Sequence, residues 1–206
     1  MDFIHRLIPS EDEHSKTTLI LLHGTGGNEE DLLPLGRFLA KDAALLGIRG
    51  KVLEDGMSRY FRRLAEGVFD EADLTFRTHE LARFIEEATS AYNLNRDGLI
   101  AVGYSNGANI AASLLLLEPD ILSAAVLFRS MVPLEPKDTP NLWGKGVLMQ
   151  SGAFDPIIPP ENSERLAQML QQAGADVTLN WQQTGHGLTN EEFVVAQTWL
   201  RERTSV

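Results

Sequence analysis

Residues 99–107 read Leu-Ile-Ala-Val-Gly-Tyr-Ser-Asn-Gly, an apolar run that leads directly into a Gly-x-Ser-x-Gly sequence. The run predicts a buried strand, and the Ala- and Leu-rich residues 108–117 predict a helix directly after it. In a turn of this kind the serine takes a strained backbone conformation that leaves its hydroxyl accessible, and the flanking glycines remove side chains that would collide. Ser105 is therefore a candidate nucleophile. The N–H group of Asn106, where the helix starts, is a candidate donor to an oxyanion.

Strands and helices alternate along the whole chain. We expect strands at about 3–8, 17–22, 48–53, 99–104, 123–128, 146–150 and 177–181, and helices at about 28–43, 74–92, 108–117, 163–173 and 189–203. Residues 57–73 fit no regular period. The alternation predicts an α/β fold with a mostly parallel seven-stranded sheet and helices on both faces. With 206 residues, the chain is expected to form one domain, 1–206, without a separate lid domain.

The composition limits the possible functions. There are 18 Lys and Arg against 29 Asp and Glu, a net charge of -11, so nucleic acid is not an expected partner. Cysteine is absent, which excludes a cysteine nucleophile and disulfide bonds. The first residues carry no secretory signal, and no apolar run is long enough to span a bilayer. We therefore expect a cytoplasmic protein without stable membrane insertion.

Two further polar residues follow predicted strands. Asp155 lies after the sixth strand and His186 after the seventh, so the chain order is Ser, Asp, His. Because the carboxyl ends of parallel strands meet at one edge of a sheet, the three side chains are expected to lie together. A serine needs a base, and a histidine base needs a carboxylate that fixes its tautomer. Taken singly, Asp155 fits a turn initiator and His186 an exposed loop, but their order and placement favour a catalytic triad.

A glycine-rich loop, His-Gly-Thr-Gly-Gly at 23–27, follows the second strand. Glycines let the main chain approach a developing oxyanion closely, so we expect the N–H groups of Thr25 and Asn106 to be its donors and His23 to brace the loop. A phosphate-binding loop is disfavoured, because position 29 is Glu29 instead of a third glycine and no Gly-Lys-Ser/Thr follows. His79-Glu80 is not a zinc motif, because the second histidine would fall at Arg83.

Several residues near the expected site are candidates for lining a substrate pocket, although simple packing explains each of them equally well. They are Met57, Tyr60, Phe61, Met131, Val132 and Leu188. Arg59, Arg62 and Arg63 form the only basic cluster. We expect these arginines to pair with Glu54, Asp55 and Glu66 in preference to a substrate carboxylate.

Together the motifs at 23–27 (HGTGG), 103–107 (GYSNG), 151–156 (SGAFDP) and 185–187 (GHG) resemble the phospholipase/carboxylesterase family of α/β-hydrolases, which includes acyl-protein thioesterases, and especially its small bacterial carboxylesterases. The resemblance covers about residues 3–200. It implies a triad of Ser105, Asp155 and His186, no metal and no cofactor, and it is compatible with a homodimer. Thioesterase relatives usually carry glutamine after the serine, where this chain has Asn106.

The sequence therefore predicts a serine hydrolase that cleaves small carboxylic esters through an acyl-enzyme. The alternatives are a thioesterase or lysophospholipase-type acyl hydrolase and, from another class, a non-catalytic binding protein on a hydrolase scaffold. The last alternative requires a broken triad, whereas this sequence carries a complete one.

Overall fold

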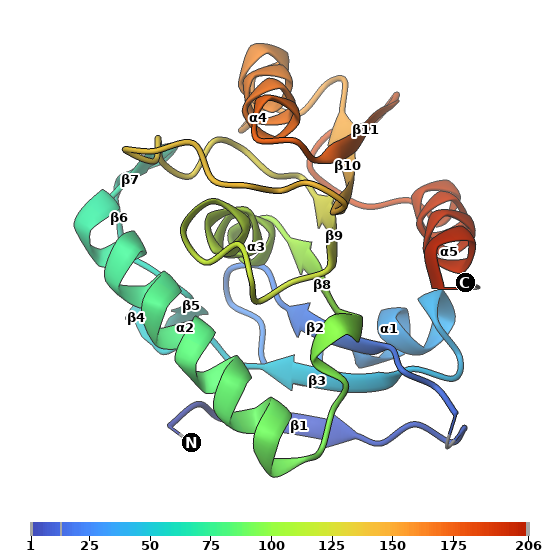
Figure 1. Ribbon diagram of the computed structural model, residues 1–206. Coiled ribbons are helices and arrows are strands. Elements are labelled where there is room, and N and C mark those ends of the chain that lie inside the picture. Colours follow the sequence, from blue (N-terminus) through green and yellow to red (C-terminus); the bar gives the residue numbers. More distant parts are fainter. Residues whose placement is uncertain (1, 13, 205–206) are drawn as a thin grey trace.

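The computed structural model describes residues 2–12 and 14–204, so residues 1, 13, 205 and 206, including both ends of the expected domain, lie outside the described residues. A seven-stranded sheet with the order β1-β3-β2-β8-β9-β10-β11 runs through its centre (Figure 1). Strand β1 pairs antiparallel with β3, and the other neighbours are parallel. This confirms the predicted α/β architecture. The strands are β1 (His5–Ile8), β2 (Thr18–Leu22), β3 (Ala44–Ile48), β8 (Leu99–Tyr104), β9 (Ala124–Phe128), β10 (Gly146–Gly152) and β11 (Asp176–Gln182).

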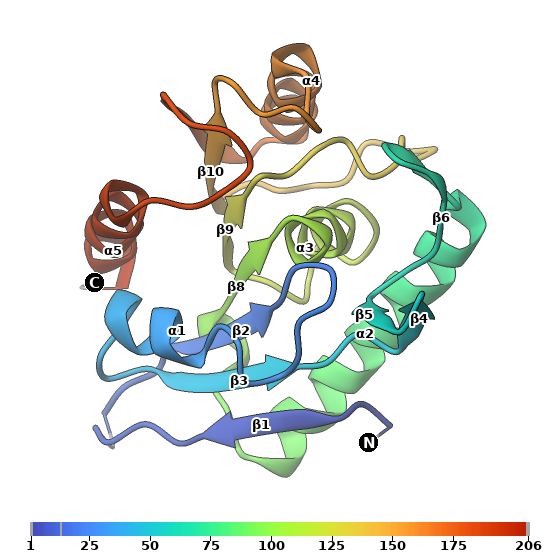
Figure 2. The same ribbon diagram turned by 180° about the vertical axis from the view of Figure 1, so that it is seen from behind.

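Helices cover both faces of the sheet, as predicted (Figures 1 and 2). One face carries α2, α3 and α4, and the opposite face carries α1 and α5. Two hydrophobic clusters result, one on each face. The helices are α1 (Leu33–Leu39), α2 (Glu71–Ala91), α3 (Asn106–Leu117), α4 (Pro160–Gln172) and α5 (Asn190–Thr204), with a short 3-10 turn, η1, at Arg96–Gly98.

The strands are continuous apolar runs because both of their faces are covered. Every residue of β2, β3 and β9 is buried, as is typical of parallel strands between two helical layers. Helix α3 is apolar around most of its circumference and lies almost wholly inside the protein. It begins directly after Ser105, so the most deeply buried helix fixes the position of the candidate nucleophile.

The chain between β3 and α2 differs from its prediction as irregular. It forms two short hairpins, β4 (Val52–Glu54) with β5 (Met57–Arg59), and β6 (Arg63–Ala65) with β7 (Val68–Phe69). Strands of two or three residues are too short to show a period of two in the sequence. Helix α2 begins at Glu71 because the Asp70 carboxylate accepts a hydrogen bond from the Asp73 N–H. The segment between β3 and α2 thus contains two hairpins.

Two other boundaries were predicted wrongly. The strand expected at 48–53 lies at 44–48, and the helix expected at 28–43 covers only 33–39. For the strand, the sequence signal is weakened by Gly47, which interrupts the apolar run of β3. Its Cα packs against the carbonyl oxygen of Glu29, where a side chain would collide. Such a close backbone approach is a common reason for glycine inside a strand.

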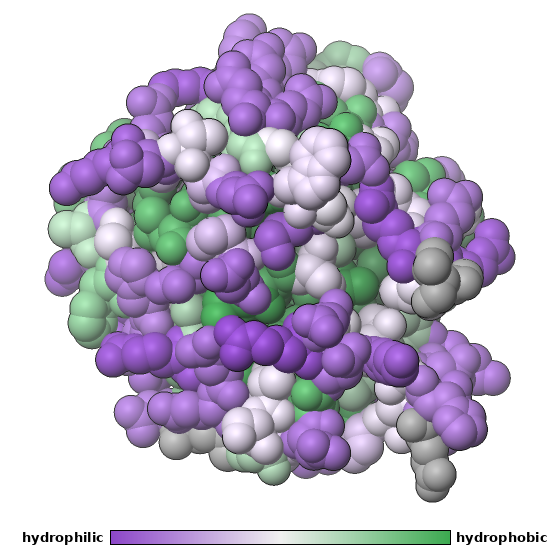
Figure 3. Space-filling model, in the orientation of Figure 1, coloured by the Kyte–Doolittle hydropathy of each residue, from purple (hydrophilic) through white to green (hydrophobic). Residues whose placement is uncertain are grey.

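The surface is mixed in polarity. Figure 3 shows hydrophilic side chains spread over one face, with hydrophobic atoms visible mainly between them. Within the described residues, no helix is both long and apolar enough to cross a membrane.

The central strands should dominate stability. Leu46 on β3 is fully buried, so Leu46→Ala should lower the free energy of unfolding by about 2–5 kcal/mol through lost burial and a residual cavity. Leu64 on the β6–β7 hairpin is 73% exposed, so Leu64→Ala should change it by less than about 1 kcal/mol. Urea unfolding followed by circular dichroism measures both values. Equal losses for the two variants would contradict the assigned core.

Candidate active site

Ser105 sits on a strained turn between β8 and α3. Its φ of 52° and ψ of -113° lie outside the regions that side chains favour. Both flanking glycines are needed for packing. A Cβ on Gly103 would lie 2.5 Å from the Gly107 carbonyl oxygen, and one on Gly107 would collide with the carbonyl oxygen of Leu22 at the end of β2. The glycines thus allow α3 to start directly against the neighbouring strand, which leaves the serine at the sheet edge.

Three side chains from three post-strand loops form one hydrogen-bonded chain. The Ser105 Oγ lies 2.9 Å from the His186 Nε2, and the His186 Nδ1 lies 2.8 Å from the Asp155 Oδ2. Since a carboxylate only accepts, Nδ1–H donates to Asp155, and the Nε2 lone pair is directed at the serine hydroxyl. The sequence-based expectation that these residues lie together agrees with this geometry.

The Asp155 carboxylate is fixed on its other side. Its Oδ1 accepts hydrogen bonds from the N–H groups of Ile157 at 2.8 Å and Ile158 at 3.2 Å. The side chain is almost completely buried, so its remaining oxygen is directed at His186 and not at solvent. A turn that begins at Asp155 therefore also orients the imidazole.

The glycine-rich loop after β2 is held by residues 58–60 of the β4–β5 hairpin. The Gly26 N–H donates to the Ser58 carbonyl at 2.9 Å, and the Arg59 Nη1 donates to the Thr25 hydroxyl at 2.7 Å. Tyr60 joins this loop to the serine turn, because its hydroxyl accepts from the His23 N–H while its own N–H donates to the Asn106 side-chain oxygen. The hairpin therefore sets the distance between the two loops.

His23 braces the loop, as the sequence suggested. Its Nδ1–H donates to the Gly24 carbonyl at 2.7 Å, and its Nε2 accepts from the Gly50 N–H at 3.0 Å. The bond from Gly50 needs the neutral imidazole, because a protonated Nε2 cannot accept. Burial, the main cause, lowers the pKa of His23 below its ordinary value, which keeps this form at neutral pH.

Two backbone donors beside Ser105 have no protein acceptor. Among the described residues, neither the Thr25 N–H nor the Asn106 N–H donates a hydrogen bond to another protein group. Both residues line the cavity that contains Ser105 and His186. Free donors at the first turn of a buried helix and in an adjacent loop are suited to an oxyanion.

Arg129, a buried arginine that no sequence motif marked, holds the loop that carries His186. Its Nε and Nη2 donate to the carbonyl oxygens of Gly185 at 3.0 Å and Gly187 at 2.6 Å, one on each side of the histidine. Its Nη1 and Nη2 also donate to the Glu192 carboxylate at 2.5 and 2.9 Å, and both side chains are fully buried.

Glu192 lies in the first turn of α5, where it is placed to cap that helix. It does accept from the Thr189 N–H at 2.9 Å, but it also supplies the counter-charge of Arg129. The only sequence signal for the pair was the charge of each residue, and an arginine after a strand belongs to no recognised motif.

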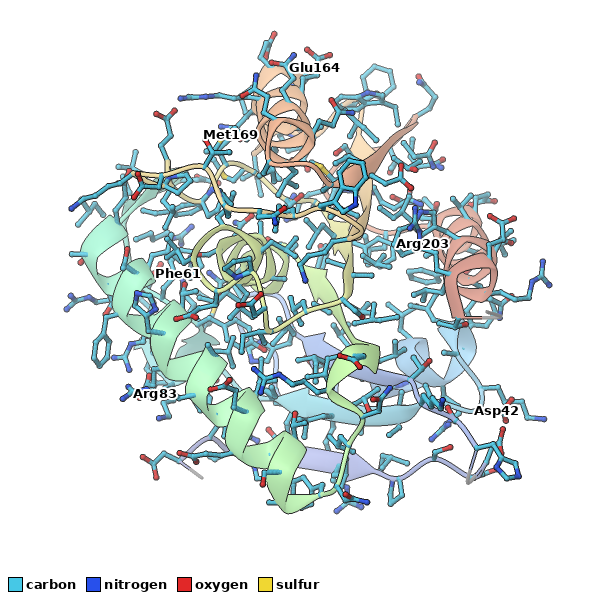
Figure 4. The ribbon with its side chains drawn as sticks, in the orientation of Figure 1. Asp42, Phe61, Arg83, Glu164, Met169 and Arg203 are labelled. Carbon is cyan, nitrogen blue, oxygen red and sulfur yellow. The ribbon has the colours of Figure 1, made fainter. Side chains whose placement is uncertain are left out.

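A cavity of about 240 Å3 opens beside Ser105. Of the six predicted pocket residues, Met131 lines it. Tyr60 and Phe61 do not, because both are buried in the protein interior. The Tyr60 hydroxyl donates to the Ile48 carbonyl, and Phe61 packs edge-on against Phe69. Figure 4 shows Phe61 beside α2.

The other three predicted pocket residues also lie elsewhere. Met57 is partly exposed on β5, Val132 packs against the α2–α3 cluster, and Leu188 packs on the opposite face of the sheet. Met57, Val132 and Leu188 are therefore not among the residues that line this cavity. In the sequence, an apolar side chain in a loop does not reveal which way it packs. The cavity is lined by Thr25, Arg59, Arg63, Glu66, Gly67, Phe69, Tyr104, Ser105, Asn106, Asn109, Met131, Ile157, Ile158 and His186.

The predicted arginine pairing is correct only in part. Arg59 and Arg63 both pair with Glu54, whereas Arg62 pairs with Asp70 and Asp73. Within residues 2–12 and 14–204, no group of three or more His, Asp or Glu side chains is placed to hold a metal ion.

The parallel sheet, the strained serine turn and the post-strand Asp and His define an α/β-hydrolase. A family model described as Phospholipase/Carboxylesterase matches residues 62–204. The chain belongs to the phospholipase/carboxylesterase family, as its motifs predicted, and is a hydrolase.

Individual relatives agree with this assignment. The putative hydrolase MhqD of Bacillus subtilis (strain 168) is 52% identical over 188 residues, which cover 91% of this chain and 94% of the relative. The solved structure of the Bacillus cereus carboxylesterase matches with a TM-score of 0.95 at 47% identity, covering 98% of this chain and 94% of that one. A carboxylesterase from Mesorhizobium loti matches with a TM-score of 0.90 at 34% identity, covering 96% and 94%.

The Arg129–Glu192 pair allows a stability test. Arg129→Met leaves a buried carboxylate without its counter-charge, so the free energy of unfolding should fall by about 3–5 kcal/mol. Arg96→Met removes an exposed pair with Glu86 and should cost less than about 1 kcal/mol. Urea unfolding of both variants makes the comparison. A cost for Arg129→Met as small as that of Arg96→Met would contradict the buried pair. The double change Arg129→Met with Glu192→Leu should recover only part of the loss, because the carbonyl oxygens of Gly185 and Gly187 stay without their donor.

His23 should make stability depend on pH. Its folded-state pKa is lowered, so its contribution is fully present above the unfolded value near 6.5 and is lost as pH falls through that range. The unfolding free energy should therefore decrease from pH 7 to pH 5.5, and His23→Gln should reduce this decrease. His14→Gln, in the N-terminal loop, is the matched control and should keep the wild-type dependence. Parallel pH profiles for wild type and His23→Gln would contradict the role of the neutral ring.

Proposed function

We propose that this protein is a carboxylesterase that cleaves small carboxylic esters through an acyl-enzyme on Ser105. The observation that carries the proposal is the continuous chain from the Asp155 Oδ2 through His186 to the Ser105 Oγ, with distances of 2.8 and 2.9 Å, at the edge of a cavity. A serine hydroxyl is a weak nucleophile until a base takes its proton, and this chain supplies the base and the group that orients it.

In the first half of the reaction, Ser105 attacks the ester carbonyl while the His186 Nε2 takes the hydroxyl proton. Asp155 holds the ring and stabilises the imidazolium that forms. The carbonyl oxygen becomes an oxyanion, which accepts hydrogen bonds from the free N–H groups of Thr25 and Asn106. When the tetrahedral intermediate collapses, the C–O bond to the alcohol breaks and His186 returns the proton to the leaving oxygen.

In the second half, water attacks the acyl group on Ser105. His186 takes a proton from that water, and the resulting intermediate uses the same two N–H donors. Collapse breaks the bond to the Ser105 Oγ, which receives the proton from His186. The carboxylic acid leaves, and the enzyme returns to its starting state.

The size of the cavity favours small substrates. Its volume of about 240 Å3 falls below the roughly 300–1,000 Å3 that is common for ligand pockets. The hairpins of residues 52–69 supply part of its lining, including Arg59, Arg63 and Phe69. The family description and the carboxylesterase relatives agree with ester hydrolysis.

The proposal is tested with p-nitrophenyl esters of increasing acyl length and with a matched thioester series. Wild-type protein should hydrolyse acetate and butyrate esters faster than the octanoate ester. Ser105→Ala should lower kcat by roughly 10^4- to 10^6-fold, because it removes the nucleophile. Ser90→Ala, an exposed serine on α2, is the control and should keep wild-type rates.

Two results would contradict the proposal. Ester hydrolysis that survives in Ser105→Ala would assign the nucleophile elsewhere. A clear preference for thioesters over the matched esters would identify a thioesterase.

A further inference from the structure

The cavity beside Ser105 has a charged side that ester hydrolysis does not require. Arg59 on β5 and Arg63 on β6 both line it. The Arg59 side chain is only 4% exposed, although a buried guanidinium carries a large desolvation cost unless its donors are satisfied. Arginine stays protonated throughout the neutral range, so this wall of the cavity carries a permanent cation.

Only some of the N–H donors of the Arg59 guanidinium have a hydrogen-bond acceptor among the described residues. Its Nε lies 3.3 Å from both the Phe61 carbonyl oxygen and the Glu54 Oε2, and its Nη1 donates to the Thr25 hydroxyl. Its Nη2 makes no hydrogen bond with any residue in the described ranges. The side chain lines the cavity, so the remaining N–H donors are available to a bound ligand.

The nearby carboxylates do not provide a separate acceptor for each of the two arginines. Glu54 is shared, because its Oε1 already accepts from the Arg63 Nε at 2.7 Å and Nη2 at 2.6 Å. Glu66 also lines the cavity, but it is exposed. Two guanidinium groups therefore face the cavity with one partly buried carboxylate between them, which suits a second, external anion.

The cavity also has an apolar part. Its apolar lining residues are Phe69 on β7, Met131 after β9, and Ile157 and Ile158 after β10. Strand β8, which leads into Ser105, lies between β2 and β9 in the sheet. The arginines and the isoleucines thus reach the cavity from opposite sides of the nucleophile's strand. A ligand that contacts both walls needs an anionic end and an apolar end.

We propose that the cavity selects short esters that carry a carboxylate, which binds at Arg59 and Arg63 while the ester carbonyl lies at Ser105. This rests on the proposed esterase function and names its substrate class. The anion would use the free donors of Arg59 in a charge-assisted pair, and the apolar part would lie against Met131 and the two isoleucines. An arginine that served only to hold the Thr25 hydroxyl would not distinguish charged from neutral substrates.

The test uses two pairs of esters that differ only in charge. Monomethyl succinate and methyl succinamate place a carboxylate or an amide on the acyl side, and 4-acetoxybenzoate and 4-acetoxybenzamide place them on the alcohol side. The quantity measured is the ratio of kcat/KM for the acid to that for its amide. Wild-type protein should show a ratio of about ten or more for at least one pair, and the pair that responds identifies the side of the ester that carries the anion.

The variants Arg59→Gln and Arg63→Gln should each lower this ratio toward one. Because the ratio compares two substrates on one protein sample, a general loss of activity cancels, and Arg63→Gln keeps the test available if Arg59→Gln does not fold. Arg62→Gln is the matched control, since Arg62 is 62% exposed and pairs with Asp70 and Asp73 outside the cavity. It should keep the wild-type ratio.

The outcomes separate this inference from the proposed function. Hydrolysis of neutral p-nitrophenyl esters together with acid-to-amide ratios at or below one for both pairs would overturn the anion subsite and leave the esterase standing. A high ratio that persists in both Arg59→Gln and Arg63→Gln would also overturn it. Failure to hydrolyse any ester would remove the esterase function, and the substrate class with it.

Discussion

The close approach of Gly107 to the end of β2 is the constraint on which the site depends. The first turn of α3 packs against the carbonyl oxygens of Leu22 and His23, with no space for a side chain at position 107. This contact sets the Asn106 N–H beside the loop that carries Thr25. The same contact places Ser105 on its strained turn, since the buried helix must start within one residue of the strand. The energy of that strain is offset by the burial of α3 between the sheet and α2.

Other hydrogen bonds and one ion pair hold the glycine-rich loop and the histidine loop in place. Tyr60 connects the glycine-rich loop at 23–27 with the serine turn, because it forms hydrogen bonds with His23 and Asn106. In the loop that carries His186, Arg129 donates hydrogen bonds to the carbonyl oxygens of Gly185 and Gly187. Its charge is balanced by the Glu192 carboxylate. A loop with two glycines next to the histidine has many accessible conformations in isolation, so a buried ion pair that holds both flanking carbonyls limits the positions of the ring. The three site residues thus rest on rigid neighbours although each lies in a loop.

The fold and the three central site residues could be predicted because they depend on local patterns. Apolar runs between turns revealed the strands, and Ser105, Asp155 and His186 each follow such a run in a characteristic order. What failed depends on tertiary contacts. Tyr60 and Phe61 look like pocket residues by composition, but only the folded chain shows that their rings point into the core. Arg129 has no motif, and its role arises from carbonyl groups more than 50 residues away along the chain. The homodimer and the cytoplasmic location stay predictions.

The central claim is that Ser105 is the nucleophile, and covalent labelling tests it most directly. The protein would be treated with a fluorophosphonate, which transfers its phosphonyl group to an activated serine with loss of fluoride, and then digested and analysed by peptide mass spectrometry. The account predicts one added phosphonyl group per chain, on the peptide that contains Ser105, with loss of label after His186→Ala and protection by an ester substrate. Label on another residue, or an unlabelled Ser105 in a protein that hydrolyses esters, would contradict the account.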